Sequence, residues 1–126
     1  MKLPGILFLV ICMLTIRCTK EEIRENVKFL GAYTMSETCG LGDDSYDLVI
    51  WESGRDAQSI VIYNLYNWGE SASARVSGNT LTIEEQILDG ITFSGSGSLN
   101  GDALEINFDV SLDSQSDSCN ATGVRK

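Results

Sequence analysis

Apolar and polar residues alternate one by one through most of the chain after residue 29, which is the pattern of half-buried β-strands. The alternation is clearest over residues 90–111, where it runs on both sides of the dipeptide Asn100-Gly101. An Asn-Gly pair between two alternating runs is a strong signal for a tight hairpin turn. Gly95 and Gly97 fall on the apolar side of the first run, where glycine permits a strand to coil sharply. The segment is therefore predicted to be a β-hairpin.

The same alternation, or a dense run of β-branched and aromatic residues, predicts further strands before and after this hairpin. They lie at residues 29–38, 46–53, 59–65, 71–76, 81–83 and 118–124. Turn residues separate the strands about every ten residues, and no helix is predicted beyond residue 28. About eight short sequential strands predict an all-β fold, an antiparallel up-and-down meander that forms either a small barrel or a curled sheet.

The first residues carry a different pattern. Lys2 precedes an apolar run over residues 6–16, which ends at Arg17-Cys18. A run of about eleven apolar residues has the length of the hydrophobic region of a signal peptide and is too short for a membrane-spanning helix. Residues 1–17 are therefore predicted to be a signal peptide, and a buried N-terminal helix or strand is the alternative.

The end of this segment resembles a bacterial lipobox, in which the cysteine is acylated and becomes the first residue of the mature protein. The matching residues are Leu14-Thr15-Ile16-Arg17-Cys18, and Arg17 departs from the small residue that normally precedes the cysteine. The following Thr19-Lys20-Glu21-Glu22 resembles the signal that sends Bacteroidota lipoproteins to the cell surface. The resemblance implies a lipid anchor on Cys18, a location at the bacterial outer membrane, and exposure at the cell surface. Residues 18–28 are expected to form a tether or a single helical turn before a β-barrel domain at 29–126.

Charge and composition then narrow the functions. Cleavage of the signal peptide removes Lys2 and Arg17 and leaves seven basic residues against eighteen acidic ones. A surface with this excess of negative charge repels nucleic acids. Histidine is absent, so the commonest general base is missing. The adjacent carboxylates Glu84-Glu85 and Asp43-Asp44 point to opposite faces of a strand and cannot act on one substrate. Residues 42–45 and 113–117 offer oxygen atoms without the spacing of a calcium loop. No enzyme activity, cofactor or metal is expected.

Two cysteines remain once Cys12 leaves with the signal peptide and Cys18 is acylated. Cys39 and Cys119 are expected to pair, because exported proteins fold in an oxidising compartment. In a closed meander with an even number of strands, the end of the first strand meets the start of the last, so this bridge would join the two strands at the barrel seam. A two-sheet sandwich could also bring them together, and two separate buried thiols are the alternative to a bridge.

Four aromatic residues are candidates for ligand contact. Trp51, Tyr63, Tyr66 and Trp68 fall in or near the loop at residues 64–70. Tyrosine and tryptophan at the mouth of a barrel can stack on sugars or line an apolar pocket. The other interpretation is that Tyr66 and Trp68 cap the end of the barrel as part of its core.

Several strand and turn motifs, taken together, resemble a group of small flavobacterial lipoproteins that are described as lipocalin-like. The motifs are Phe29-Leu30-Gly31-Ala32-Tyr33, Glu37-Thr38-Cys39, Ser77-Gly78-Asn79-Thr80-Leu81-Thr82-Ile83, Phe93-Ser94-Gly95-Ser96-Gly97-Ser98-Leu99 and Cys119-Asn120-Ala121-Thr122-Gly123. The resemblance covers the mature chain and implies a lipocalin-like barrel. It implies nothing about chemistry, because these are positions of strands and turns.

The sequence thus leads to two hypotheses. In the first, the chain is a non-catalytic, envelope-anchored binding module for a small apolar ligand, a glycan or an envelope protein. In the second, it is a structural lipoprotein with a solid core and no small-molecule site. The barrel interior separates the two, because a carrier of small ligands requires a cavity there. A barrel filled by Tyr33, Phe93, Ile106 and Phe108 would exclude an interior carrier.

Overall fold

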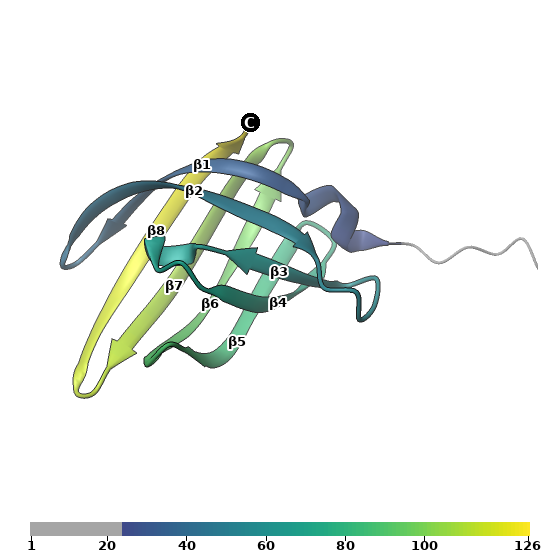
Figure 1. The fold of residues 1–126 in the computed structure, drawn as a ribbon. Coiled ribbons are helices and arrows are strands. Elements are labelled where there is room, and N and C mark those ends of the chain that lie inside the picture. Colours follow the sequence, from purple (N-terminus) through teal and green to yellow (C-terminus); the bar gives the residue numbers. More distant parts are fainter. Residues whose placement is uncertain (1–23) are drawn as a thin grey trace, which may run out of the picture.

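The computed structural model describes residues 24–126, and the signal peptide, Cys18 and most of the tether predicted above lie outside them. Eight antiparallel strands make up the described chain (Figure 1). They are β1 (Gly31–Cys39), β2 (Gly42–Glu52), β3 (Ser59–Tyr63), β4 (Ser71–Ser77), β5 (Thr80–Leu88), β6 (Ile91–Asn100), β7 (Ala103–Leu112) and β8 (Gln115–Arg125). Each strand pairs with the next along the chain and β8 pairs with β1, so the sheet is a closed barrel. The predicted all-β meander is confirmed, in its closed form.

The predicted hairpin is the turn between β6 and β7. Asn100 pairs with Ala103, and Gly101 takes the left-handed backbone conformation, with φ of 65°, that a tight hairpin turn requires. The inward-facing Gly95 lies so close to β7 that a Cβ atom placed on it would be 2.4 Å from the carbonyl oxygen of Asn107. Only glycine permits this approach of two strands, as expected for a small, strongly coiled barrel.

Two hairpins are longer than the residue pattern predicts. β2 begins at Gly42 and β8 at Gln115, a few residues before the first apolar residue of each strand. The ladder continues to the pairs Cys39↔Gly42 and Leu112↔Gln115, so both turns are two residues long. Backbone hydrogen bonds continue these ladders through polar residues, which carry no alternation that a sequence pattern could show.

Two short 3-10 helices interrupt the all-strand pattern: η1 (Glu25–Phe29) precedes β1, and η2 (Leu65–Asn67) joins β3 to β4. η1 is packed against the barrel. The Asn26 backbone N–H donates to the carbonyl oxygen of Ala57 at 3.0 Å, and its side-chain amide donates to that of Ser59 at 3.1 Å. Phe29 is fully buried. The packed fold therefore starts inside the segment that the sequence predicts as a tether.

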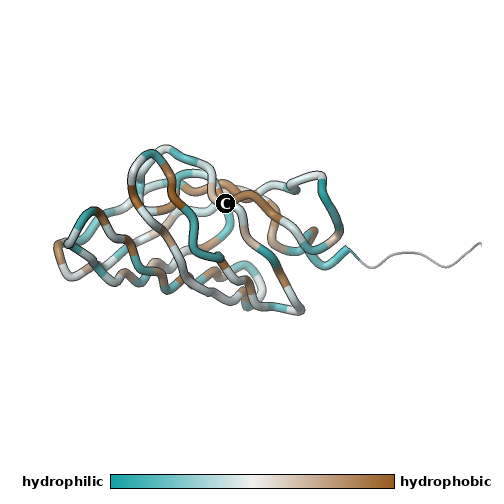
Figure 2. Tube along the Cα trace, turned by 90° about the horizontal axis from the view of Figure 1, so that it is seen from below, coloured by the Kyte–Doolittle hydropathy of each residue, from teal (hydrophilic) through white to brown (hydrophobic). Residues whose placement is uncertain are grey.

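Hydrophobic side chains fill the interior of the barrel, and Figure 2 shows hydrophobic and hydrophilic residues alternating along the strands. The exposed fractions of Tyr33, Phe93, Ile106 and Phe108 are 0, 0, 0 and 2 %. A void that could hold even a water molecule would leave accessible surface on the side chains around it. The interior around these four side chains is therefore solid, and residues 24–126 form a barrel with a core of its own.

The seam between β1 and β8 closes the barrel. Its ladder runs over seven pairs, from Tyr33↔Arg125 to Cys39↔Cys119. The last pair is covalent: the two cysteines form a disulfide, and their Cα atoms are 4.1 Å apart. The predicted bridge at the seam is confirmed. Gly123 lies in the same ladder, where an added Cβ would be 2.2 Å from the carbonyl oxygen of Thr34.

Candidate functional site

Two of the four candidate aromatic residues form an exposed pair on the outside of the barrel. The register of β2 and β3 places Trp51 opposite Val61 and Tyr63 opposite Val49, so Trp51 and Tyr63 are diagonal neighbours on one face. Their ring centroids are 5.9 Å apart and their planes differ by 23°. Trp51 is 42 % exposed and Tyr63 39 %. Two large aromatic rings that share a face and remain open to solvent can stack on a ligand.

The other two aromatic residues lie at one end of the barrel, where Tyr66 packs on the core and Trp68 is exposed. The Tyr66 ring packs edge-on against Phe93 and Phe108, with centroid distances of 6.0 and 6.1 Å. Tyr66 has φ of 67°, and its backbone N–H donates to the hydroxyl of Tyr46. The indole N–H of Trp68 donates to the carbonyl oxygen of Leu88 at 2.9 Å. Tyr66 therefore caps the core, whereas Trp68 is 37 % exposed and is not packed into the core.

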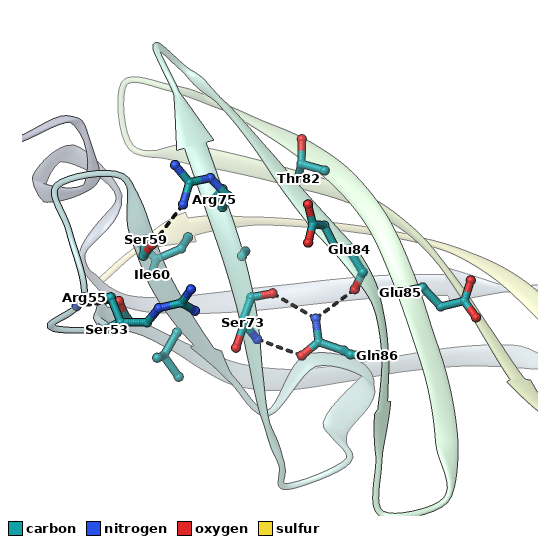
Figure 3. Close-up of a pocket in the computed structure, with 12 residues that line it drawn as sticks. Ser53, Arg55, Ser59, Ile60, Ser73, Arg75, Thr82, Glu84, Glu85 and Gln86 are labelled. Atoms are coloured by element: carbon teal, nitrogen blue, oxygen red, sulfur yellow. Dashed lines mark hydrogen bonds between the residues drawn. The ribbon is translucent and has the colours of Figure 1, made fainter.

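The ladder between β4 and β5 is interrupted. It has three pairs, at the end of the hairpin, from Ser77↔Thr80 to Arg75↔Thr82. Beyond them the register of β5 on β6 shifts between Ile83 and Gln86, which is a β-bulge, and β5 has no further partner in β4. The two strands diverge, and the side chain of Gln86 extends across the space between them (Figure 3).

A groove of about 410 Å³ follows this divergence on the outside of the barrel. Most of the residues that line it are polar, and they include Ser53, Arg55, Ser73, Arg75, Glu84 and Gln86. We refer to this groove and the Trp51–Tyr63 pair on the neighbouring strands as the outer-wall site. The outer-wall site combines hydrogen-bond donors and acceptors with aromatic rings, as binding sites for polar ligands do.

The two arginines of the groove differ in their surroundings. Arg75 lies 3.4 Å from a carboxylate oxygen of Asp56, and hydrogen bonds from the Ser59 hydroxyl and the Gln58 backbone N–H hold the pKa of that carboxyl below its ordinary value. Arg55 lies in the loop between β2 and β3, and within residues 24–126 its guanidinium forms no ion pair. The groove thus presents a cation that is available to a ligand.

A buried carboxyl group lies near the disulfide, at the end of the barrel that Tyr66 caps. The Tyr46 hydroxyl donates to one oxygen of Glu37 at 2.6 Å, and the other oxygen is 3.4 Å from the Cys39 sulfur. That sulfur carries no hydrogen, since it belongs to the disulfide. Burial raises the pKa of Glu37, and the hydrogen bond from Tyr46 opposes this shift. Both sulfur atoms are used by the disulfide, so neither offers a thiolate to a metal.

A smaller hollow of about 130 Å³ opens at this same end. It is mostly apolar, with Leu41, Ile91, Val110 and Leu112 around Tyr66 and Asp117. The Asp117 carboxylate accepts hydrogen bonds from the backbone N–H groups of Gly40 and Leu41, which form the turn after β1. The carboxylate of Asp117 thus pairs the backbone N–H groups of this turn and stabilises the end of the barrel.

These features define a closed eight-stranded up-and-down β-barrel with a filled interior and a candidate site on its outside. No family model matches the chain, and no curated protein matches it. No helix within residues 24–126 is long and apolar enough to span a membrane. Sequence reasoning missed Arg55, Gln86 and the divergence of β4 from β5. The available signal was the run Glu84-Glu85-Gln86, which breaks the alternation that precedes it.

Proposed function

We propose that the chain is a lipid-anchored, non-catalytic binding module of the bacterial outer membrane. It carries a lipocalin-like barrel and binds a macromolecule of the cell envelope on its outer wall. One observation carries this proposal: the interior is filled, while the Trp51–Tyr63 pair and the groove beside it are open. Ligand sites for small molecules enclose about 300 Å³ or more, which the solid interior does not provide.

The position of η1 supports a role for this wall in an anchored protein. Its contacts lie at the end of the barrel where β2 joins β3 and β4 joins β5. The Glu25 carboxylate accepts the backbone N–H of Gly78 at 2.9 Å, and Lys28 donates to Asn79 at 3.2 Å. Arg55 lies at the same end, so an anchor on Cys18 would hold the groove near the membrane.

A non-catalytic role agrees with the chemistry of the outer-wall site. The chain has no histidine, and both cysteines of the described chain form the disulfide. Arg55, Arg75, Ser73 and Gln86 can hold a ligand by charge and hydrogen bonds. Among residues 24–126, the hydroxyl of Ser73 has no hydrogen bond to a base of the kind that activates a nucleophile.

The anchor and the binding surface are tested separately. Intact mass of the protein from a bacterial envelope should show loss of residues 1–17 and added acyl mass on Cys18. For binding, immobilised protein is exposed to purified envelope polysaccharide and to detergent-extracted envelope proteins. The double variant Trp51→Ala/Tyr63→Ala should bind at least about tenfold more weakly than the native chain, since loss of 1.4 kcal/mol is a tenfold change.

The matched control is Leu112→Ala, which removes an exposed apolar side chain at the capped end of the barrel. It should leave binding unchanged. Equal binding by the double variant and the native chain would contradict the outer-wall site. In that case the purely structural lipoprotein, for which the filled interior is the supporting observation, becomes the better proposal.

A further inference from the structure

The divergence of β4 from β5 leaves backbone groups of β4 without a strand partner on one side. Residues Ser71–Ala74 pair with β3, while the pairs with β5 begin only at Arg75. Backbone N–H and C=O groups along such an edge form a template for another strand. At about 3.3 Å per residue, the open edge is roughly 13 Å long and matches an extended segment of four to five residues.

Gln86 occupies part of this opening and imitates a peptide group. Its Oε1 accepts the backbone N–H of Ser73 at 2.9 Å, and its Nε2 donates to the carbonyl oxygen of Ser73 at 2.9 Å. Two residues that exchange both bonds in this way form the hydrogen-bonded pair of an antiparallel ladder. The same Nε2 also donates to the carbonyl oxygen of Glu84 at 2.9 Å. The amide therefore bonds to β4 on one side and β5 on the other, as a strand between them would (Figure 3).

The side chains around the opening define what such a strand would carry. Ala72 and Ala74, the inward-facing residues of this edge, are buried and apolar, so the inward face of an added strand would lie beside apolar side chains. On the outward face, Arg55 offers a guanidinium without an ion pair among residues 24–126. Alternate residues of a strand face opposite sides, so the fitting segment alternates apolar and polar residues and carries a carboxylate among the polar ones.

We propose that the gap between β4 and β5 binds an extended polypeptide segment by strand addition, with the amide of Gln86 displaced by a peptide group of the partner. This inference rests on the proposed function and specifies the partner of the outer-wall site as a polypeptide. The ligand would gain main-chain hydrogen bonds from both strands and specificity from Arg55 and the alanines. Gln86 holds the gap in its unbound form, because its side chain satisfies Ser73 and Glu84 until the partner arrives.

The experiment uses the full chain purified in detergent and a panel of fluorescein-labelled seven-residue peptides. The panel consists of alternating valine and threonine with a central aspartate, the same peptide with central lysine, and the aspartate peptide methylated on alternate backbone nitrogens. Fluorescence anisotropy should show binding of the aspartate peptide, at least tenfold weaker binding of the lysine peptide, and no binding of the methylated one. Methylation removes the main-chain donors and leaves the side chains unchanged.

Variants then test the role of Gln86. Gln86→Ala should bind the aspartate peptide about three- to tenfold more tightly, because the competing amide is gone. Gln115→Ala, which removes an exposed glutamine at the start of β8, should bind it as the native chain does. Ser73→Pro should lose binding: proline removes the N–H that faces the gap, while the bonds between β4 and β3 use the neighbouring residues. Peptide binding to the native chain should also slow hydrogen exchange at the Ser73 amide.

The outcomes separate the inference from the proposed function. Equal binding of the methylated and unmethylated peptides, or no binding by any peptide of the panel, overturns strand addition. If envelope polysaccharide still binds and requires Trp51 and Tyr63, the outer wall remains the site and its ligand is a glycan. If neither peptide nor envelope material depends on the outer wall, both proposals fail. The peptide comparison uses the native chain, so it decides the matter even where a variant does not fold.

Discussion

Removal of the Cys39–Cys119 disulfide should lower the free energy of unfolding by about 4.5 kcal/mol. The bridge joins residues separated by 80 positions in the chain. In the chain-entropy model, closing a loop of that length removes roughly 15 cal/mol/K from the unfolded ensemble, which is about 4.5 kcal/mol at 25 °C. The seam ladder of seven pairs remains in the folded state, so the barrel should keep its topology and lose stability through the unfolded chain.

Urea unfolding of the native chain and of Cys39→Ala/Cys119→Ala, followed by tryptophan fluorescence, measures this difference. The native chain with its disulfide reduced is the control, because it lacks the bridge and keeps both sulfur atoms beside Glu37. Both forms should lose a similar amount of stability. A loss below about 1 kcal/mol in both would refute the reasoning and would mean that the unfolded chain is already compact around the seam.

Two further predictions concern the ends of β1 and β8. Burial raises the pKa of Glu37 above its ordinary value of 4.5. The protonated side chain therefore favours the folded state fully below pH 4.5, and this contribution to stability is lost as the pH rises through the raised pKa. Glu37→Gln keeps an acceptor for Tyr46 and cannot ionise, so this variant should be more stable than the native chain at pH 8, and the difference in stability should shrink toward pH 4. Urea unfolding between pH 4 and pH 8 measures this difference. A difference that does not depend on pH would contradict the raised pKa of Glu37. Gly123→Ala places a Cβ 2.2 Å from the Thr34 carbonyl oxygen and should lower the free energy of unfolding by about 2–3 kcal/mol, measured by thermal unfolding. The control Thr122→Ala, at an exposed position, should change it by less than about 0.5 kcal/mol. Equal effects of the two substitutions would mean that the seam tolerates the extra atom.

The fold could be predicted well from sequence because its determinants are local and periodic. Alternation fixes which residues face the core, and Asn100-Gly101 fixes the register of one hairpin. The ends of β2 and β8 could not be placed, since they are held by backbone pairs between polar residues on both faces. Phe29 was assigned to a strand by its position in the alternation, and it is buried from a 3-10 helix instead.

The outer-wall site was harder to predict because it depends on where two strands separate. The bulge after Ile83 changes which face Gln86 occupies, and only the three-dimensional register shows that its amide reaches Ser73. The four aromatic residues gave a similar difficulty. Their nearness in sequence suggested one cluster, while the turn at Tyr66 directs that ring into the barrel end and leaves Trp51 and Tyr63 on the outside.

The seam has a consequence for biosynthesis. Within residues 24–126, β1 is synthesised before the other strands and its second partner, β8, after them, so one edge of β1 stays unpaired until the end of the chain is available for folding. Its outward residues Thr34, Ser36 and Thr38 are polar, which makes the waiting strand a poor template for aggregation. A chain that stops before β8 can neither close the barrel nor form the disulfide. Premature termination late in the message should therefore yield an open, protease-sensitive sheet, and the cell would discard it.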